Sequence, residues 1–476
     1  MAATTLQTLD GRELALDDVR VSRLASRLTG RVVRAGDPTA DAVRRVWNGM
    51  IDRTPALVVQ CAGVADVVET VRFAGEHELP VAVRGGGHGV AGHAVADGAL
   101  VVDLGAMRSV EVDPDRRRVR ADGGCRLEDV DRATQAHGLA TPLGVVSQTG
   151  IAGLTLSGGM GWLRRAHGLS CDNLVAADVV TADGTVVRAS EDDNPDLLWA
   201  LRGGGGNFGV VTAFEYRLHP VGPDVAVTFV LYPGEHAVEL MDAVGAWLAE
   251  APEAVSPLCV LGRVPHADAF PPELHGRPYL AVVGLHPGDP ADGEAVQRPL
   301  RELGTPLVDL SATMPYTQAQ TLLDEDYPDG GRYYWKSLEL PELRPDVARR
   351  LVEHAAAAPS DHSTIDVWYG GGAMARVAPD ATAFGSRPPI LLGYEANFDD
   401  AADAAANVGW ARGSVAELQP FSSGGAYLNF PGFFEEGDAL LRASFGDANY
   451  ERLVGLKSRY DPRNAFRFNG NIPPTP

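Results

Sequence analysis

Three consecutive glycines and a histidine follow a short apolar strand in the segment Val81-Ala-Val-Arg-Gly-Gly-Gly-His-Gly89. Consecutive glycines let a backbone pass close to a ligand and turn its N–H groups toward an anion. The imidazole of His88 then lies on a loop whose geometry its neighbours fix. This combination favours a cofactor that carries a pyrophosphate, with an imidazole close to it, and it indicates redox chemistry.

The same loop has simpler interpretations. Glycine-rich loops are often only tight turns, and a single histidine is often structural. The stretch Gly87-His-Gly89-Val-Ala-Gly92 also matches the dinucleotide-binding pattern GxGxxG, which requires a helix directly after it. Here a turn at Asp97-Gly98 comes next, followed by a strand over 99–104. We therefore reject a Rossmann NAD site.

A segment without charged side chains runs from Gly138 to Leu163. It is too rich in Gly, Ser, Thr and Pro for a membrane helix. Uncharged backbone of this kind suits a buried loop around a flat, mostly apolar ligand. The alternative is a glycine-rich turn that is buried by the fold alone.

The elements before the glycine loop must hold it in place. The residue pattern predicts a helix over 37–47, a strand over 56–60, a helix over 65–77 and a strand over 80–84. The last three form a β-α-β unit that leads directly into the glycine loop.

A second glycine loop at 203–209 lies between a predicted helix over 194–202 and a predicted strand over 210–217. Pro220 and Pro223 indicate a domain boundary. Beyond it, the pattern predicts strands over 227–232 and 279–285 and longer helices over 235–249 and 344–358. This α+β pattern without glycine loops suits a domain that shapes a substrate pocket.

Composition narrows the class of protein. The chain has 476 residues, which suggests two or three domains, and its 45% apolar and 22% charged residues are ordinary for a globular protein. Its formal charge of −22 argues against a nucleic-acid or anionic-membrane partner, because phosphate binding needs clustered Lys and Arg. The basic run at 116–118 is flanked by aspartates.

Cys61, Cys125, Cys171 and Cys259 show no CxxC pairing, so the sequence indicates neither a disulfide framework nor a zinc or other metal site. The first seven residues lack a basic region followed by an apolar one. We therefore expect no signal peptide and a cytoplasmic protein with reduced thiols.

Several motifs stand in a characteristic order along nearly the whole chain: Arg84-Gly-Gly-Gly-His88, Gly150-Ile-Ala-Gly153, Ser157-Gly-Gly-Met-Gly161, Gly168-Leu-Ser-Cys-Asp-Asn173, the segment 198–212, Tyr427-Leu-Asn429 and Tyr460-Asp-Pro-Arg-Asn464. Together they resemble the vanillyl-alcohol oxidase superfamily with its PCMH-type FAD-binding domain. More narrowly, they resemble the berberine-bridge-enzyme-like FAD-linked oxidases, in particular the monocovalent bacterial type similar to 6-hydroxy-nicotine oxidase.

The resemblance implies an α+β fold with a discontinuous FAD-binding domain. Residues 1–220 form this domain from two α/β subdomains. Residues 221–420 form a substrate domain with an antiparallel sheet covered by helices. Residues 421–476 return to the FAD-binding domain.

The resemblance also implies that His88 is bonded covalently to the 8α-methyl group of the flavin. Many relatives carry a second, cysteinyl tether, and the corresponding position here is Val146. We therefore expect a single covalent bond. The implied FAD-binding residues are Arg84, Gly85, Gly86, Gly87, His88, Gly89, His93, Thr149, Gly150, Gly153, Gly158, Gly161, Asp172, Asn207, Gly209, Val211, Tyr427 and Asn429.

The activity that the resemblance implies is hydride transfer from a small molecule to flavin N5, with reoxidation by O2 to give H2O2. The substrate class stays open among alcohols, sugars, amines and natural-product scaffolds. Thr149 is similar in size to the valine of oxygen-reactive members, which favours an oxidase. The alternatives are a dehydrogenase with another acceptor and a non-catalytic flavin-binding protein.

One departure from the family bears on catalysis. Sugar- and alcohol-oxidising relatives often have a tyrosine where this chain has Met160, whereas the second tyrosine of their pair survives as Tyr427. A phenol acts as a base only if its neighbours lower its pKa from about 10. Tyr427 is therefore either a catalytic residue or a side chain that only packs on the ring, and Asn429 could hydrogen-bond flavin or substrate.

A second catalytic candidate set lies in a predicted strand over 332–337. Alternation places Tyr334 and Lys336 on one face, and Tyr333 and Trp335 on the other. One of these faces could line the pocket, or the face could only pack.

Overall fold

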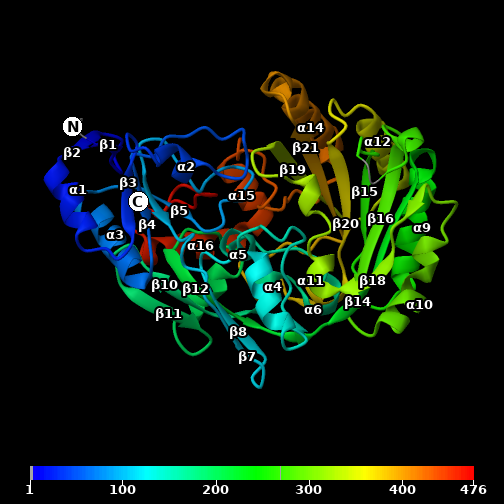
Figure 1. Ribbon diagram of the computed structural model, residues 1–476, viewed down its shortest axis with the longest axis horizontal. Helices are drawn as coiled ribbons and strands as arrows, with labels where there is room; N and C mark the ends of the chain where they lie inside the picture. Colours follow the sequence, from blue (N-terminus) through cyan, green and yellow to red (C-terminus); the bar gives the residue numbers. More distant parts are fainter. Residues whose placement is uncertain (1–3, 268–269, 476) are drawn as a thin grey trace.

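The computed structural model describes residues 4–267 and 270–475 of the chain. Its architecture is α+β, as expected, with sheets of four, five and eight strands. Figure 1 shows the smaller sheets on the left and the large sheet on the right, and the C-terminal segment in red returns to the left-hand part. The first three residues, which belong to the region expected to lack a signal peptide, lie outside the described residues.

The four-stranded sheet positions the glycine loop. Its order is β3 (Arg31–Arg34), β4 (Leu57–Gln60), β6 (Leu100–Asp103) and β5 (Val81–Arg84). Strands β4, β6 and β5 are parallel. The glycine loop begins where β5 ends, at the sheet edge formed by the carboxyl ends of these strands. Helix α3 (Val64–Glu76) forms the crossover and buries Val67, Val71 and Ala74.

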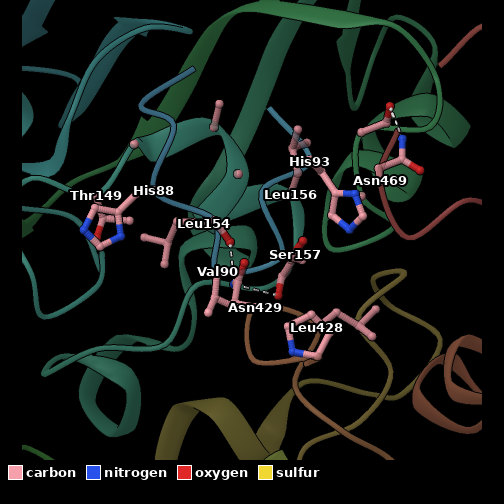
Figure 2. A pocket seen from close by; sticks show the side chains of 18 of the residues that line it. His88, Val90, His93, Thr149, Leu154, Leu156, Ser157, Leu428, Asn429 and Asn469 are labelled. Carbon is pink, nitrogen blue, oxygen red and sulfur yellow. Dashed lines mark hydrogen bonds between the residues drawn. The ribbon is translucent and has the colours of Figure 1, made fainter. Parts of the chain in front are cut away.

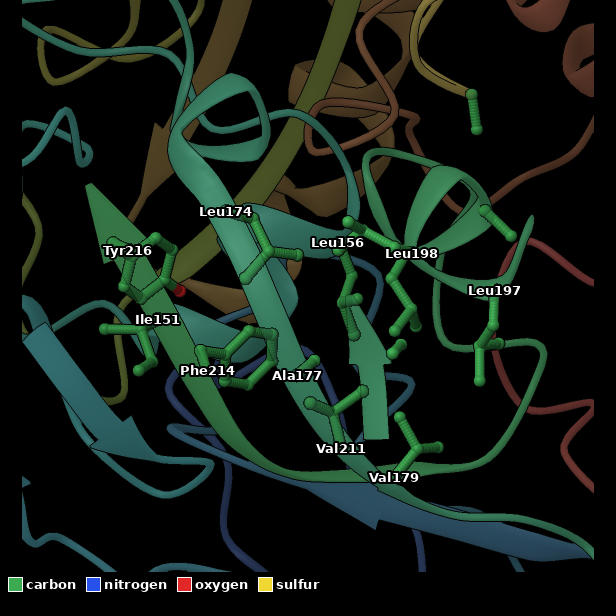
Figure 3. Close-up of a cluster of buried hydrophobic side chains, with 14 of the residues drawn as sticks. Ile151, Leu156, Leu174, Ala177, Val179, Leu197, Leu198, Val211, Phe214 and Tyr216 are labelled. Carbon is green, nitrogen blue, oxygen red and sulfur yellow. The ribbon is translucent and has the colours of Figure 1, made fainter. Parts of the chain in front are cut away.

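The five-stranded sheet is antiparallel, with the order β11 (Val186–Ser190), β10 (Leu174–Val180), β12 (Val210–Arg217), β8 (Arg118–Asp122) and β7 (Val110–Asp113). Side chains of β10 and β12 form a core with helices α5 (Ile151–Leu156) and α8 (Pro195–Leu201). Figure 3 shows Leu174 and Phe214 from the strands beside Ile151 and Leu198 from the helices. This core supports the segment 144–160, which contains α5, and the loop at 203–209.

The large sheet is antiparallel, as expected for the substrate domain. Its order is β17 (Val308–Asp309), β14 (Asp224–Pro233), β16 (Pro278–His286), β15 (Leu258–Arg263), β20 (Thr364–Tyr369), β21 (Ile390–Phe398) and β19 (Arg332–Leu340), and β18 (Ala312–Pro315) pairs with β14. One face packs against α9 (Ala237–Glu250), α10 (Pro290–Arg301), α12 (Pro345–Ala356) and α14 (Ala404–Leu418).

The other face of this sheet packs against the uncharged segment 138–163. Met160 and Trp162 share one buried cluster with Leu258 and Trp368 of the sheet. The segment is therefore largely buried, as its composition predicted. It forms the boundary between the N-terminal sheets and the large sheet.

The C-terminal segment packs against the five-stranded sheet region. Helices α15 (Asp438–Phe445) and α16 (Asp447–Tyr460) bury Phe445, Tyr450 and Leu453 in the same cluster as α8. These contacts support the division into residues 1–220, 221–420 and 421–476, which stays a prediction.

The helix predicted over 37–47 is shorter than expected. Helix α2 covers only Ala40–Arg44, because Arg45 has an extended backbone with ψ of 135°. Trp47 and Asn48 therefore lie outside the helix, beside the glycine loop.

Candidate active site

A cavity extends from the glycine loop to the large sheet. Its walls come from segments that are far apart in the sequence. The N-terminal half contributes Gly85–Gly89, Thr149, Gly150, Gly153, Gly209 and Val211; the sheet contributes Trp335, Asp366, Trp368, Leu391 and Glu395; and the C-terminal segment contributes Tyr427 and Asn429. Within the described ranges, no lysine or arginine lines this cavity.

The glycine loop has the form of an anion cradle. A Cβ atom on Gly86 would lie 2.5 Å from the Cα of Gly150, so a side chain there would push the two loops apart. Gly87 has a φ of +70°, which favours glycine. Among the described residues, the backbone N–H groups of residues 85–89 have no hydrogen-bond acceptor. Unpaired N–H groups on a side-chain-free loop fit the pyrophosphate of a dinucleotide cofactor.

His88 stands at the end of this cradle. Its half-buried imidazole stacks on Trp47, with 4.1 Å between ring centroids and 15° between planes. Burial lowers the pKa of His88 to about 3, so the ring is neutral at pH 7. Its Nε2 atom is buried and has no hydrogen-bond partner in the part of the chain that the structure describes. Figure 2 shows His88 beside Thr149, with His93 on the other side of the pocket.

Tyr427 and Asn429 form a hydrogen-bonded pair in the cavity wall. The Tyr427 hydroxyl oxygen accepts from the Met160 backbone N–H and from Asn429 Nδ2, both at 2.9 Å. Asn429 also donates to the carbonyls of Leu154 and Ser157 (Figure 2).

Burial raises the pKa of Tyr427 to about 12, although these donors oppose the shift. The lowered pKa that a phenolate base requires is therefore not found. Both neighbours donate to the oxygen of the neutral phenol, so its own proton is free to be donated to another acceptor.

Sequence reasoning missed two buried carboxyl groups at the other end of the cavity. Asp366 on β20 and Glu395 on β21 are 3% and 2% exposed and line the cavity. Burial raises the pKa of Glu395 to about 7, and burial together with the charge of Glu395 raises that of Asp366 well above its usual range. The Tyr327 hydroxyl donates to Glu395 Oε2 at 2.7 Å. A single acidic residue inside each apolar strand was the available signal.

Tyr334 and Lys336 lie on the opposite face of β19 from the cavity, and only Trp335 of this stretch lines it. The Tyr334 hydroxyl donates to Glu435 at 2.6 Å and accepts from Arg412 at 2.9 Å. Lys336 forms an ion pair with Glu436. The alternation was thus foreseen, but the face that contacts the cavity is the one that carries Trp335.

Five of the expected FAD-binding residues support the cavity from behind and do not line it. Arg84 donates to the Val43 carbonyl at 2.5 Å, Asp172 forms an ion pair with Arg387 at 2.7 Å, Asn207 donates to the Gly470 carbonyl at 3.1 Å, and Gly158 and Gly161 pack closely on Phe384 and Leu143. The other expected positions, His93 included, line the cavity.

All four cysteines are free and buried, and burial raises their thiol pKa values. None of them lines the cavity, whereas Val146 does. Within the described residues there is no group of His, Cys, Asp and Glu side chains arranged to hold a metal ion. In the same residues, no helix combines the length and apolar character that crossing a membrane requires.

Comparison with known proteins identifies the family. Residues 55–190 match the family model described as FAD binding domain, and residues 426–473 match the one described as berberine and berberine like. The uncharacterized FAD-linked oxidoreductase YgaK of Bacillus subtilis is 30% identical, covering 94% of this chain and 98% of that protein.

Two further relatives carry names that state an activity. The (R)-6-hydroxynicotine oxidase of Paenarthrobacter nicotinovorans is 30% identical over 95% of this chain and 99% of that protein. The xylooligosaccharide oxidase of Thermothelomyces thermophilus is 29% identical over 90% of this chain and 89% of that protein.

The crystal structure of 6-hydroxy-D-nicotine oxidase from Arthrobacter nicotinovorans superposes with a TM-score of 0.84 at 28% identity, covering 94% of this chain and 98% of that one. The fold, the glycine cradle and the full-length similarity all indicate the same family. The chain therefore belongs to the berberine-like FAD-linked oxidoreductases and is an FAD-binding enzyme.

Proposed function

We propose that this enzyme is an oxidase that carries FAD on His88 through one bond to the 8α-methyl group, and that its substrate is a small amine that enters as a cation. The observation that carries the proposal is one cavity with the glycine–histidine loop at one end and a buried carboxyl pair at the other. When bound, FAD supplies the hydride acceptor and passes the electrons to O2, which gives H2O2.

The environment of His88 supports covalent attachment. A nitrogen lone pair is needed to form the bond, and the lowered pKa keeps the imidazole neutral at physiological pH. Val146 at the position of the second tether and the absence of cysteines from the described cavity wall support a single bond.

The substrate end of the cavity favours a cation. Asp366 and Glu395 supply negative charge on ionisation, and the described wall offers no Lys or Arg to compensate for it. Trp335, Trp368 and Tyr327 line the same region, and aromatic faces attract ammonium groups. A carboxylate substrate would meet like charge here, and a neutral sugar could donate hydrogen bonds to the carboxyl pair but would not neutralise its charge.

The same carboxyl pair can accept a proton from the ammonium form of an amine substrate. An ammonium group must lose a proton before hydride leaves the adjacent carbon, because the nitrogen lone pair stabilises the iminium product. With a pKa of about 7, Glu395 can accept that proton near neutral pH. Tyr327, which donates to Glu395, stabilises the ionised form.

The test is anaerobic flavin reduction, followed by oxygen. N-methylbenzylamine and other secondary benzylic amines are mixed with the enzyme and compared with benzyl alcohol and xylobiose. We expect the amines to bleach the flavin absorbance, and H2O2 to form when oxygen is admitted.

The outcomes separate the parts of the proposal. Bleaching by the neutral compounds alone would overturn the amine class and leave the flavin oxidoreductase intact. Bleaching by amines without reoxidation by O2 would show a dehydrogenase that uses another acceptor.

A further inference from the structure

The segment around Trp47 and Asn48 lies between the glycine loop and the large sheet. The Trp47 ring is sandwiched between two others: it stacks on His88, and on Tyr333 of β19 with 3.8 Å between centroids and 3° between planes. Trp47 is 4% exposed. One indole therefore contacts both the FAD-binding loop and the substrate-domain strand.

Backbone hydrogen bonds fix this indole on both sides. The Trp47 N–H donates to the Gly87 carbonyl at 3.1 Å, directly beside His88. On the other side, the Trp47 carbonyl accepts from the Gly330 N–H at 2.9 Å, and the indole Nε1 donates to the Tyr327 carbonyl at 2.9 Å.

Asn48 completes the connection with a fully buried amide. Its Nδ2 donates to the Val90 carbonyl at 2.7 Å and to the Tyr333 carbonyl at 2.8 Å. Its Oδ1 accepts from the Tyr333 N–H at 3.2 Å and from the Met50 N–H at 3.0 Å. A buried amide with both donors and its acceptor in use holds its neighbours firmly, because an unmade bond there is costly.

Stacking on Trp47 restricts the plane of the His88 ring. Among the described residues the Nε2 atom has no hydrogen-bond partner, so no such bond from that atom fixes the orientation of the imidazole. Bond formation to a flavin methyl group requires the ring nitrogen to point at that carbon. The face of Trp47, itself held against Tyr333, confines the imidazole to one plane.

We infer that Trp47 is a positioning residue that orients His88 for covalent attachment of the flavin, and that Asn48 anchors it to the substrate domain. The inference rests on the proposed attachment at His88. It also links the two ends of the cavity, because Tyr327 accepts from the Trp47 indole through its carbonyl and donates to Glu395 through its hydroxyl.

The test compares Trp47→Leu with Trp47→Phe. Leucine removes the stack, whereas phenylalanine keeps an aromatic face against His88. We expect conversion of bound FAD to the covalent form to be about three- to tenfold slower in Trp47→Leu, the rate equivalent of losing one aromatic pair, and to be largely restored in Trp47→Phe. Intact-protein mass spectrometry over time after purification gives the covalent fraction, and the flavin absorbance spectrum gives total occupancy.

The matched control is Trp199→Leu. Trp199 is 6% exposed, and its indole also donates to a backbone carbonyl, that of Asp380 at 2.8 Å, but the ring stacked on His88 is that of Trp47. The loss of Trp199 damages a core without touching His88, so covalent attachment should proceed at the wild-type rate in the folded, FAD-loaded variant.

Three results decide between the hypotheses. Wild-type attachment kinetics in Trp47→Leu, or equal slowing in Trp199→Leu, would overturn the positioning role. If Trp47→Leu does not fold, Trp47→Phe is compared with Trp47→Val instead. Covalent attachment of bound FAD must then be faster in Trp47→Phe than in Trp47→Val. Wild-type protein without covalent flavin would instead refute the attachment at His88 on which the inference rests.

Discussion

Tyr427 and Glu395 both reach the substrate region of the cavity, and burial acts on both in the same direction. For Tyr427 it raises a pKa that is already high to about 12, which leaves the phenol neutral at every physiological pH. For Glu395 it raises a low pKa to about 7, which brings the titration into the working range. The carboxyl group, and not the phenol, is therefore suited to accept a proton.

This assignment predicts a specific effect of Glu395→Gln. Glutamine keeps the shape and can accept from Tyr327, but it cannot take a proton. The rate of anaerobic flavin reduction by an amine substrate at pH 8 should fall by about a hundredfold or more, the typical contribution of a general base. In the wild type this rate should rise as pH increases through about 7, since only the ionised Glu395 accepts a proton. Stopped-flow absorbance measures both effects across pH 5–9, a range of about two units on each side of the Glu395 pKa of about 7.

Tyr427→Phe serves as the comparison. It removes a cavity hydroxyl without changing the carboxyl pair, so the rise near pH 7 should persist with a modest loss of rate. A flat pH profile in the wild type would show that Tyr427, and not Glu395, accepts the proton. A larger loss of flavin-reduction rate in Tyr427→Phe than in Glu395→Gln would show the same.

The elements around the cavity also contain a buried acid that plays no part in the proposed chemistry. Asp131 on α4 (Leu127–Gln135) is 2% exposed, and its Oδ2 accepts from Gln320, just beyond α11 (Tyr316–Ala319), at 3.0 Å. Its Oδ1 has no hydrogen-bond partner within residues 4–267 and 270–475. Burial raises the pKa of Asp131 to about 7, so its charged form destabilises the folded state.

Asp131→Asn should therefore raise Tm at pH 8 relative to the wild type and have little effect at pH 5. The raised pKa means that the folded state holds a proton that the unfolded state releases between about pH 4 and pH 7, so wild-type stability falls as pH rises through this window. Asparagine can still accept from Gln320, and it carries no charge to desolvate. Differential scanning calorimetry at both pH values tests the expectation.

The contrasting variant is Asp129→Asn, two residues away on the same helix. Asp129 forms an ion pair with Arg108 at 2.7 Å, so its neutralisation should lower Tm at pH 8. Equal shifts in the two variants would show that position on α4, and not the unpaired buried charge, determines the response.

At the same scale, the sequence predicted the elements around the glycine loop well, because β5 and α3 follow from local apolar periodicity. It predicted the two faces of β19 through the alternation of Tyr334 and Trp335, but it could not decide which face contacts the cavity. That choice depends on α14 covering the opposite face, a contact between segments far apart in the chain.

For the whole molecule, the cavity forms only when three distant segments meet. The glycine loop, the large sheet and the stretch around Tyr427 and Asn429 each supply part of its wall. The sequence motifs predicted the residues at the FAD end of this cavity, because a backbone that passes close to a dinucleotide requires glycine at particular positions. The approach of Asp366 to Glu395 could not be predicted, because it depends on the register of β20 against β21, which places Glu395 opposite Thr364 and Asp366 opposite Gly393.

This assembly predicts that FAD stabilises the whole fold even without its covalent bond. In His88→Ala the glycine cradle remains, so FAD should bind reversibly and be released into the supernatant on acid precipitation. FAD that fills this cavity would contact walls from all three segments, so it would bind the folded state and not the unfolded chain. A hundredfold excess over its Kd should add about 2.7 kcal/mol to the free energy of unfolding.

The measurement is Tm of flavin-depleted His88→Ala with and without added FAD, in a single cooperative transition followed by near-UV circular dichroism. NAD has a pyrophosphate and adenine but no isoalloxazine, so at equal concentration it should shift Tm far less. The N-terminal sheets and the large sheet should unfold together when FAD is present, because both contribute to the wall of the cavity that would hold it. If FAD left Tm unchanged, or if it stabilised only one of two separate transitions, the cavity would belong to one domain alone and the arrangement of its three walls would not control FAD binding.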